Sequence, residues 1–429
     1  MARIGSVLVD VGRLRHHREF RLLTIGGLIG GLGRQITLIA LPYQLYVLTR
    51  SPLAIGALAM VQLVPLLTFS MVGGAIADTV ERRRLLLITQ GSLLLCSAAL
   101  ALIATLSEPP ILLIYAVAFL AGGISAVDLP TRSSATYRVV PREELPWAIS
   151  ISQVSWSISS VVGPAFGGVL ITVVGLPAAY FTDMLTFVVS IATVAALAPM
   201  PPLGKAKRLG LGAIREGLRY ARQTRVLMAT FVVDLDAMIF GLPVALFPIL
   251  SVEVFQTGAA GVGLMTAAPA AGALLGAVFT GWVHRVRFQG RAVIAAVAVW
   301  GIAIVGFGLA TFSFPLALLF LAIAGAADMY SAIFRSTILQ VRLPDHLRGR
   351  ISALHLTVVT GGPRLGDLES TVVAAAVNAS FSAVSGGVLC LLGLIAVARR
   401  YPELAAYDAH HAAEEAAELS RTEAEAAAG

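Results

Sequence analysis

A few ionisable side chains lie within the long apolar stretches of this sequence. These side chains could bind and release protons or form ion pairs. They are Arg34, with the neighbouring amide Gln35, and the carboxylates Asp183, Asp234, Asp236 and Asp328. A charge inside an apolar membrane stretch is costly unless it faces a polar cavity or an opposite charge. A carboxylate that alternates between an apolar environment and one beside a cation would bind and release a proton. We therefore predict that these residues include the proton-coupling groups of a central cavity.

Asp234 is the carboxylate to which we assign this role, with Arg34 or Asp328 as its neighbour. Asp234 and Asp236 are two positions apart, so on a helix their side chains point about 200° from each other. They cannot both face one cavity directly. A fixed ion pair that holds two helices together is the alternative for Asp234.

Other polar residues fall at the ends or along the sides of these stretches. Asp128 and Arg132 are four positions apart, so they share one helical face and can pair locally, and we predict a structural charge pair there. Tyr43, Gln44, Gln153 and Trp156 are candidate substrate-lining residues, with simple packing or interface anchoring as the alternative for each.

The composition of the chain requires a lipid environment. With 57% hydrophobic and 13% charged residues over 429 residues, and a mean hydropathy of +0.85, a water-soluble fold would have too little polar surface. Cys96 and Cys390 lie in apolar runs of opposite halves, so neither a disulfide framework nor a metal site is predicted. The sequence lacks HExxH, GxSxG and Walker A motifs, so we expect no enzyme chemistry and no cofactor.

Twelve apolar stretches are long enough to cross about 30 Å of hydrocarbon as helices. They run over 22–47, 53–77, 85–106, 111–135, 147–172, 177–199, 226–253, 258–283, 292–312, 316–340, 351–376 and 379–398. The predicted parts are a lead-in at 1–21, a six-helix bundle at 22–199, a basic linker at 200–225, a second bundle at 226–398 and an acidic Ala/Glu-rich tail at 399–429. The fold class is therefore all-α and integral to a membrane.

The positive charges set the orientation, because Lys and Arg near span ends are retained on the cytoplasmic side. With both termini in the cytoplasm, Arg50 is the only basic residue that falls in an outer loop. We expect a multi-pass protein of the cell (inner) membrane. The net charge of +7 comes without a basic patch interleaved with aromatic residues, so no nucleic-acid partner is predicted.

The two halves resemble each other in sequence. Ala121, Gly122, Arg132 and Pro141 have counterparts at one constant offset in Ala324, Gly325, Arg335 and Pro344. A weaker echo relates Gly56 and Gly74 to Gly263 and Gly281, but the counterpart of Asp78 is Arg285. Many transporters are duplicated bundles with the substrate site at the repeat interface. The pattern predicts two pseudo-symmetric six-helix bundles around a central cavity.

Two local motifs resemble those of the major facilitator superfamily. The run from Gly74 through Asp78 to Arg82, Arg83 and Arg84 is similar to its signature loop after the second span, although Thr79 and Glu81 replace the usual Arg and Gly. The resemblance implies a cytoplasmic gating loop. Gly163, Pro164, Gly167 and Gly168 resemble the Gly-Pro-x-x-Gly-Gly core of the antiporter motif of drug and proton exchangers, with Ser150 and Ser159 in place of its upstream glycines.

A wider likeness covers most of the chain. The runs 128–132, 140–146, 152–156, 348–352 and 361–367 resemble the enterobactin-exporter-like branch of the superfamily. The resemblance implies the major facilitator fold and proton-driven export of a siderophore or an amphipathic drug-like molecule by a monomer, powered by an ion gradient. An importer of a small nutrient and a non-transporting sensor or scaffold are the alternatives.

Overall fold

The computed structural model describes residues 11–201, 218–220, 222–342 and 348–409. Within these ranges the side chains of residues 11, 70–78, 284, 342, 348–350, 352–354, 356 and 357 lie outside the description. Over the described residues the chain folds entirely into helices and connections, without a β-strand. The all-α fold class is confirmed.

The chain divides into two compact units, which we describe separately. Unit 1 comprises Met1–Arg208 and Phe247–Ala267, and unit 2 comprises Leu209–Leu246 and Ala268–Gly429. The two units do not coincide with the two halves of the chain. Residues 247–267 belong to the second half of the sequence, but they pack with the first half. The limits of the two bundles at 22–199 and 226–398 remain a prediction.

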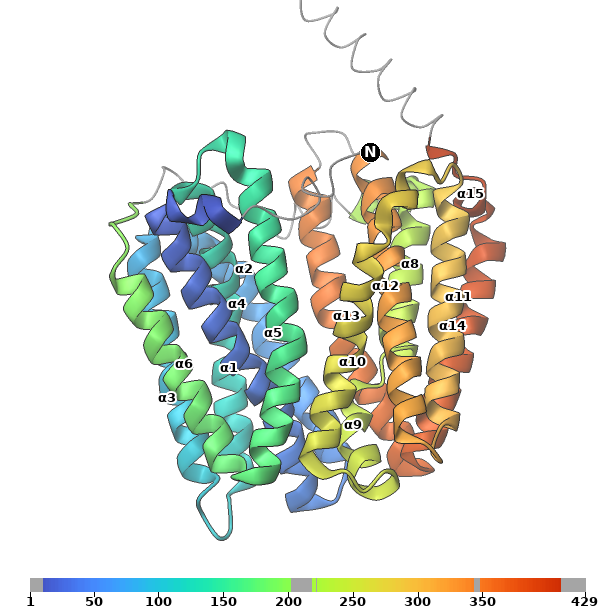
Figure 1. The fold of residues 1–429 in the computed structure, drawn as a ribbon. Helices are drawn as coiled ribbons and strands as arrows, with labels where there is room; N and C mark the ends of the chain where they lie inside the picture. Colours follow the sequence, from blue (N-terminus) through green and yellow to red (C-terminus); the bar gives the residue numbers. More distant parts are fainter. Residues whose placement is uncertain (1–10, 202–217, 221, 343–347, 410–429) are drawn as a thin grey trace, which may run out of the picture. The chain divides into compact units, whose positions relative to one another are not determined.

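Unit 1 is built on six long helices (Figure 1). They are α1 (Arg18–Thr49), α2 (Pro52–Thr79), α3 (Arg82–Ile103), α4 (Ile111–Val139), α5 (Leu145–Val173) and α6 (Leu176–Ala195). Shorter elements are η2 (Val11–Arg15), η3 (Arg142–Glu144), α9 (Phe247–Ile249) and the π-helix η5 (Leu250–Val254). Helix α1 packs against α5 and α6, while α4 packs against α2 and α3. Helix α1 is thus the helix around which the candidate site is arranged.

Small residues on α1 explain its close approach to α6. A Cβ atom added at Gly26 would lie 3.3 Å from the Thr193 Cβ atom, and one added at Gly30 would lie 3.4 Å from the Ser190 hydroxyl oxygen. In a membrane, small residues at a helix interface allow the backbones to approach and pack without a hydrophobic driving force. Because Gly26 and Gly30 are four positions apart, they lie on the same face of α1, and this face packs closely against α6.

Unit 2 contains the remaining long helices. They are α8 (Arg225–Phe240), α11 (Gln289–Leu309), α12 (Phe314–Arg342), α13 (Arg348–Ala376) and α14 (Ala379–Arg400), with the shorter η4 (Val244–Leu246), η6 (Thr280–Arg285) and α15 (Pro402–Ala405). The later part of α10 (Gly258–Val278) also belongs here. Helix α11 packs against α12 and α14, and α13 packs against α8 and α14.

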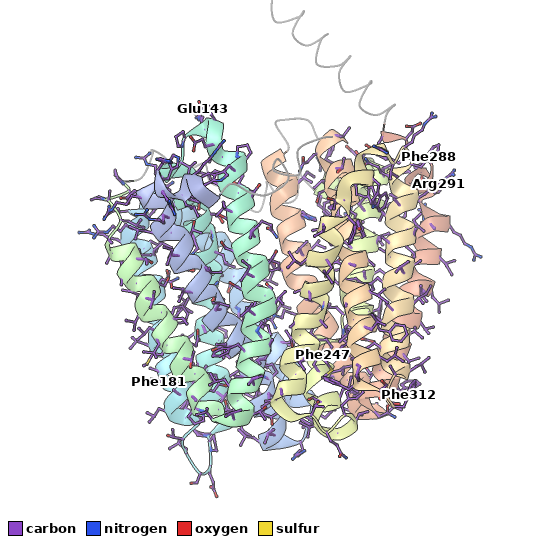
Figure 2. All side chains as sticks on the ribbon, in the orientation of Figure 1. Glu143, Phe181, Phe247, Phe288, Arg291 and Phe312 are labelled. Atoms are coloured by element: carbon purple, nitrogen blue, oxygen red, sulfur yellow. The ribbon has the colours of Figure 1, made fainter. Side chains whose placement is uncertain are left out.

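Eleven helical segments of the described chain are long and apolar enough to cross a membrane, counting Arg225–Val254, with its break, as one. The predicted stretch 351–376 forms α13, which has 29 residues but carries Arg364, Asp367 and Glu369 along its length. Exposed apolar side chains such as Leu95 on α3 (68%) and Ile302 on α11 (60%) are what lipid-facing helices require. Phe181 and Phe312 are exposed in the same way (Figure 2).

The seventh predicted stretch, 226–253, is a broken helix rather than a continuous one. Helix α8 ends at Phe240, and the chain continues through the short elements η4, α9 and η5. The break leaves the Gly241 carbonyl outside the regular helical pattern, and the Trp300 indole nitrogen donates a hydrogen bond of 2.8 Å to it. Non-helical backbone at membrane depth is tolerated where protein groups satisfy it, as here.

Candidate functional site

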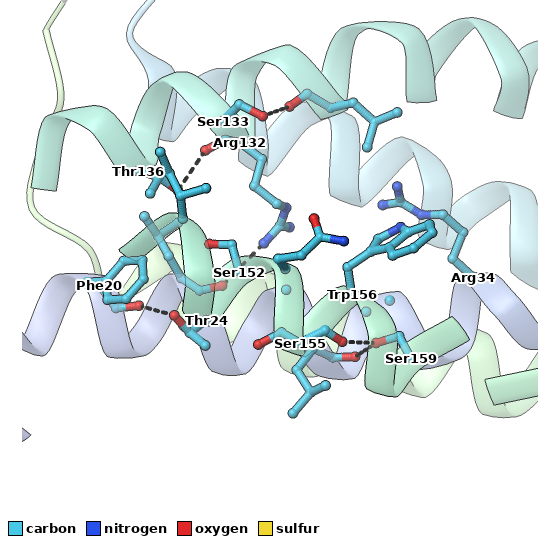
Figure 3. A pocket seen from close by; sticks show the side chains of 18 of the residues that line it. Phe20, Thr24, Arg34, Arg132, Ser133, Thr136, Ser152, Ser155, Trp156 and Ser159 are labelled. Atoms are coloured by element: carbon cyan, nitrogen blue, oxygen red, sulfur yellow. Dashed lines mark hydrogen bonds between the residues drawn. The ribbon is translucent and has the colours of Figure 1, made fainter. Parts of the chain in front are cut away.

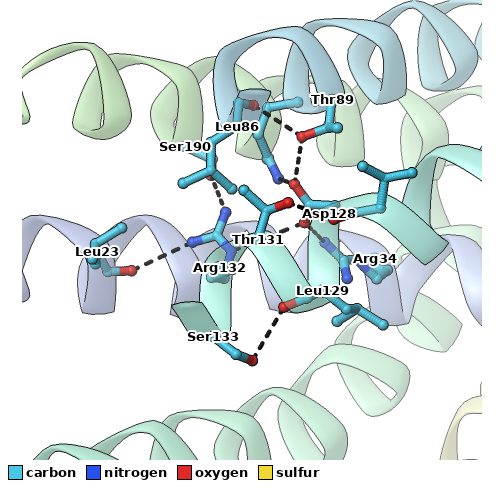
Figure 4. A network of polar contacts seen from close by, with 12 residues as sticks. Leu23, Arg34, Leu86, Thr89, Asp128, Leu129, Thr131, Arg132, Ser133 and Ser190 are labelled. Atoms are coloured by element: carbon cyan, nitrogen blue, oxygen red, sulfur yellow. Dashed lines mark hydrogen bonds and ion pairs between the residues drawn. The ribbon is translucent and has the colours of Figure 1, made fainter. Parts of the chain in front are cut away.

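Asp128 on α4 is the centre of a buried polar network in unit 1 (Figure 4). Its carboxylate is fully buried. The Thr89 hydroxyl and the Gln90 amide, both on α3, donate hydrogen bonds of 2.7 Å to Oδ1. On the other side, the Arg34 guanidinium on α1 lies 3.3 Å from Oδ2. The carboxylate therefore joins α1, α3 and α4.

Arg132 is a second guanidinium on the same carboxylate. Its Nε atom lies 4.0 Å from Asp128 Oδ2, one helical turn away on α4. Its terminal nitrogens donate to the Ser190 hydroxyl on α6 (3.3 Å) and to the Leu23 carbonyl on α1 (3.5 Å). The Asp128–Arg132 ion pair is therefore within one helix, and the ion pair of Asp128 that joins two helices is with Arg34.

A cavity of about 380 Å³ opens beside this network, among α1, α4 and α5. It follows α1 from Phe20 to Gln35, and Arg34 and Arg132 both line it (Figure 3). Hydroxyl and amide groups of α5 form another part of its wall, together with Trp156. This volume falls within the usual range of small-molecule sites, about 300 to 1,000 Å³. The mixed polar and aromatic wall suits an amphipathic ligand.

Unit 2 contains a second buried charge cluster. Arg335 on α12 lies 2.7 Å from a carboxylate oxygen of Asp234 on α8 and 3.7 Å from one of Asp328 on its own helix. Arg335 and Asp234 are buried, whereas the Asp328 side chain is 34% exposed. His355 on α13 lies within electrostatic range of Asp234 and Arg335. One guanidinium is thus shared by two carboxylates.

Arg132 of the first cluster and Arg335 of the second occupy equivalent positions of the sequence repeat, but the carboxylates around them do not. In unit 1 the first helix supplies a cation, Arg34, and the fourth an anion, Asp128. In unit 2 the corresponding helices supply Asp234 and Arg335. As a result, unit 1 has two guanidiniums around one carboxylate, and unit 2 has two carboxylates around one guanidinium. The ion-paired groups therefore have a surplus of guanidiniums in unit 1 and a surplus of carboxylates in unit 2.

A family model described as transmembrane secretion effector matches residues 13–425. The chain belongs to this family. It is 28% identical over 408 residues to the enterobactin exporter EntS of Escherichia coli O127:H6, covering 92% of this chain and 96% of the relative. The protein of the same name from Escherichia coli O81 is 27% identical over 407 residues, with the same coverage. The resemblance to the enterobactin-exporter-like branch is confirmed.

Solved structures share the fold of this secretion effector at low sequence identity. A POT family transporter in complex with 5-aminolevulinic acid has a TM-score of 0.72 and 10% identity, over 90% of this chain and 96% of that one. The nucleoside transporter NupG has a TM-score of 0.64 and 14% identity, over 89% and 98%. The secretion effector is a multi-pass major facilitator transporter of the exporter branch, with a small-molecule substrate. It is not an enzyme.

The predicted proton-coupling residues separate into three environments. Asp234 and Asp328 share Arg335, which was predicted only as the repeat counterpart of Arg132 and not as the neighbour of Asp234. Asp236 points elsewhere, to the Cys390 thiol on α14, as the angle between neighbouring positions predicts. Arg34 belongs to unit 1 and pairs there with Asp128, so its predicted role as a neighbour of Asp234, in unit 2, stays a prediction.

Asp183 on α6 is held by hydroxyl groups. Its Oδ2 atom accepts hydrogen bonds from Thr37 (2.6 Å) and Ser97 (2.7 Å), and within the described part of the chain it forms no ion pair. Gln35 donates to the Ser160 hydroxyl at 3.1 Å and also lines the cavity.

The predicted substrate-lining residues divide between cavity and packing. Gln153 and Trp156 line the cavity. Gln44 is buried and accepts a hydrogen bond of 2.7 Å from the Tyr180 hydroxyl, so it joins α1 to α6. Tyr43 lies near the backbone of Gly258, away from the cavity wall.

Sequence reasoning missed three serines of the cavity wall. Ser152, Ser155 and Ser159 are spaced three and four positions apart, so they share one face of α5. That spacing was visible in the sequence and could have identified a polar stripe on an otherwise apolar helix.

The signature-loop residues are partly described. The side chains of Gly74 and Asp78 lie outside the described residues, and the backbone of α2 is helical through both. Arg82 donates to the Ser134 hydroxyl on α4 (3.1 Å), and Arg83 donates to the Ala195 carbonyl at the end of α6 (2.7 Å). Arg84 forms a local ion pair with Glu81 (3.4 Å). Arg82 and Arg83 thus link the start of α3 to α4 and α6.

The antiporter-like motif forms the packing face of α5. Gly163, Pro164, Gly167 and Gly168 are all buried. A Cβ atom at Gly163 would lie 3.0 Å from the Leu32 carbonyl oxygen, and one at Gly167 would lie 3.1 Å from the Ile36 Cα atom, both on α1. One at Gly168 would lie 2.6 Å from the Ala259 carbonyl oxygen on α10. The motif therefore lets α5 approach both α1 and the start of α10.

Proposed function

We propose that this secretion effector exports a siderophore or an amphipathic drug-like small molecule in exchange for protons, by alternating access. The observation that carries the proposal is the similarity to enterobactin exporters over 92% of the chain. The proposal places the protein in the cell inner membrane as a monomer, with both termini in the cytoplasm. An ion gradient powers transport, and no cofactor takes part.

The cavity in unit 1 supports a small-molecule substrate. Its volume of about 380 Å³ is large enough for part or all of a compound of a few hundred daltons. Its wall combines hydroxyl groups with Phe20, Tyr137 and Trp156. Such a wall would bind an amphipathic molecule by apolar contact and orient it by hydrogen bonds.

The cluster in unit 2 supports proton coupling. Removing the only partner of a buried charge is strongly destabilising, whereas protonating one of two carboxylates beside Arg335 leaves the other ion pair intact. Asp234 and Asp328 are these two carboxylates, with His355 as the further titratable group. The partial exposure of Asp328 would give protons a route from water. Asp234 is the carboxylate whose ion pair would be exchanged for a proton.

Export is tested by comparing a deletion strain that carries the wild-type gene with one that carries the empty vector. Accumulation and resistance are measured for siderophores, macrolides and dyes. The wild-type gene is expected to lower the accumulation of at least one class of compound. If neither accumulation nor resistance changes for any compound, export is contradicted.

Proton coupling is tested with Asp234→Asn in membrane vesicles that carry an imposed pH gradient. The variant should lose proton-driven efflux by about tenfold or more, because an amide in place of the carboxylate cannot bind and release a proton. It should keep substrate counterflow, which needs no proton gradient. Asp408→Asn is the matched control, because Asp408 pairs with Arg287 at an exposed site of unit 2. Unchanged proton-driven efflux in Asp234→Asn would show that Asp234 is not the proton site.

A further inference from the structure

We propose that the cavity in unit 1 is an anion site and that the exported substrate is an amphipathic organic anion. This inference rests on the proposed function, because it assigns the cavity to the exported molecule. It deepens that function by naming the charge of the substrate and the groups that select it.

The argument begins with a surplus of positive charge. Arg34 and Arg132 share a single carboxylate, Asp128, and a guanidinium stays protonated in a protein. The other buried carboxylate nearby, Asp183, is within electrostatic range of Arg34, but it is hydrogen-bonded by Thr37 and Ser97, forms no ion pair among the described residues and does not line the cavity. The Asp128 network therefore carries one more positive charge than negative charge.

That surplus charge faces the cavity. The described residues of the cavity wall include both arginines and no aspartate or glutamate. The Arg34 side chain is 36% exposed, and its Nε atom is buried without a hydrogen-bond partner among the described residues. Asp128, by contrast, is fully buried behind the arginines. A ligand in the cavity would meet guanidinium donors and not the carboxylate that partly neutralises them.

Guanidinium groups specify the chemistry of the anion. Their planar donors match the paired oxygens of a carboxylate or a similar delocalised oxyanion. A charge-assisted hydrogen bond of this kind is roughly twice as strong as a neutral one. Figure 3 shows Trp156 beside Arg34, with Phe20 toward the opposite end of the view. The substrate class is thus an organic molecule with an oxyanion group and an aromatic or apolar body.

The rule that retains basic residues on the cytoplasmic side of a membrane does not explain why Arg34 lines the cavity. Cytoplasmic arginines follow from membrane orientation, whereas Arg34 lies in the middle of the 32-residue helix α1. A charge placed there is retained for an ion pair or a ligand. The ion pair with Asp128 accounts for one guanidinium, and in the described part of unit 1 neither Arg34 nor Arg132 forms an ion pair with a second carboxylate.

The test uses two probes of nearly the same shape, 2-naphthoate and the neutral 2-naphthamide. Binding of each to the purified full-length protein in detergent is measured by isothermal titration calorimetry. Naphthoate should bind about tenfold or more tightly than naphthamide, as expected for a charge-assisted contact. Equal binding of the two probes, or no binding of naphthoate, would overturn the proposal.

Three variants then test the surplus charge itself. Arg34→Gln balances the network and should abolish the preference for naphthoate, while Asp128→Asn adds net positive charge and should increase it. The combination of Arg34→Gln with Asp128→Asn leaves Arg132 unpaired and should restore the preference. Arg18→Gln is the control, because Arg18 is an exposed arginine at the start of α1 that pairs with Glu19. An unchanged preference in Arg34→Gln would overturn the proposal.

These outcomes separate the anion site from export. The comparison of the two probes on the wild-type protein needs no variant, so it decides the proposal even if Arg34→Gln does not fold. Binding also needs no flux. Efflux of neutral compounds together with equal probe binding would contradict the anion site alone. A preference for naphthoate together with failed efflux would contradict the proposed export alone.

Discussion

Asp128 shows how a single residue can hold several helices and set the charge of a cavity. Its carboxylate receives two neutral hydrogen bonds from α3 and two guanidinium contacts from α1 and α4. A buried carboxylate that is both hydrogen-bonded and ion-paired is stable, whereas the groups around it become costly when it is removed. Asp128 is thus a structural residue that also determines how much positive charge Arg34 and Arg132 present.

We predict that Asp128→Asn lowers the free energy of unfolding by about 3 kcal/mol, because it leaves two partly buried guanidiniums without the carboxylate that they share. Adding Arg34→Gln should recover part of the loss, because one of those guanidiniums is then gone. Thermal unfolding of the purified variants in detergent measures both effects. Glu403→Gln is the control, since the exposed Glu403–Arg225 pair contributes about 0–1 kcal/mol. Equal losses for Asp128→Asn and Glu403→Gln would contradict the prediction.

At the scale of elements, glycines decide which helices can approach each other. The face of α5 that contains Gly163, Gly167 and Gly168 contacts α1 and the start of α10. Because these positions lack side chains, the backbones pack closely and the cavity wall on α5 stays next to Arg34. The Gly-Pro-x-x-Gly-Gly pattern therefore has a packing role in this chain, whatever the direction of transport.

Gly168→Val should destabilise this packing by about 1–3 kcal/mol and reduce transport, because the new side chain would collide with backbone atoms of Ala259 and Gly263. The melting temperature in detergent and the rate of efflux are the measurements. Gly91→Val on α3 is the matched control, because a Cβ atom at Gly91 meets nothing within 4 Å. If the two variants melt at the same temperature, close packing at Gly168 does not matter for stability.

At the scale of the whole molecule, each half has a charge cluster on its first and fourth helices, with two guanidiniums and one carboxylate in unit 1 and the reverse ratio in unit 2. Arg132 and Arg335 occupy equivalent positions on α4 and α12, yet their networks carry a surplus of opposite sign. If the unit 1 cluster binds an anion and the unit 2 cluster a proton, the duplicated fold separates substrate and coupling ion between its halves. The two roles would then respond to different mutations.

The orientation of the chain gives a further prediction. Ser107 lies in the exposed connection between α3 and α4, and Arg142 in the exposed connection between α4 and α5. In a protein whose Cys96 and Cys390 are replaced by alanine, a membrane-impermeant maleimide should label Ser107→Cys in intact cells but not Arg142→Cys. Permeabilised cells, in which both should react, are the control. The reverse labelling would place the termini outside the cytoplasm.

The sequence by itself determined the environment and the long helices. Apolar stretches of membrane length and basic residues in alternate loops follow from local composition, so the stretches that became α1, α3, α4 and α11 could be predicted. The break after Phe240 could not, because its stability depends on Trp300, far away in the chain. Helix α13 was predicted as a span, yet Arg364, Asp367 and Glu369 make it more polar than the others.

Only the tertiary structure decided which ionisable residues meet. The sequence placed Arg34, Asp128, Asp234 and Arg335 on helices, but helix periodicity relates only neighbours within one turn or two. The partners of Asp128 come from α1 and α3, and the partner of Asp234 comes from α12. These contacts depend on how helices pack, which glycine positions and crossing geometry control over distances of many residues. The anion site and the shared carboxylates therefore appeared only in the folded chain.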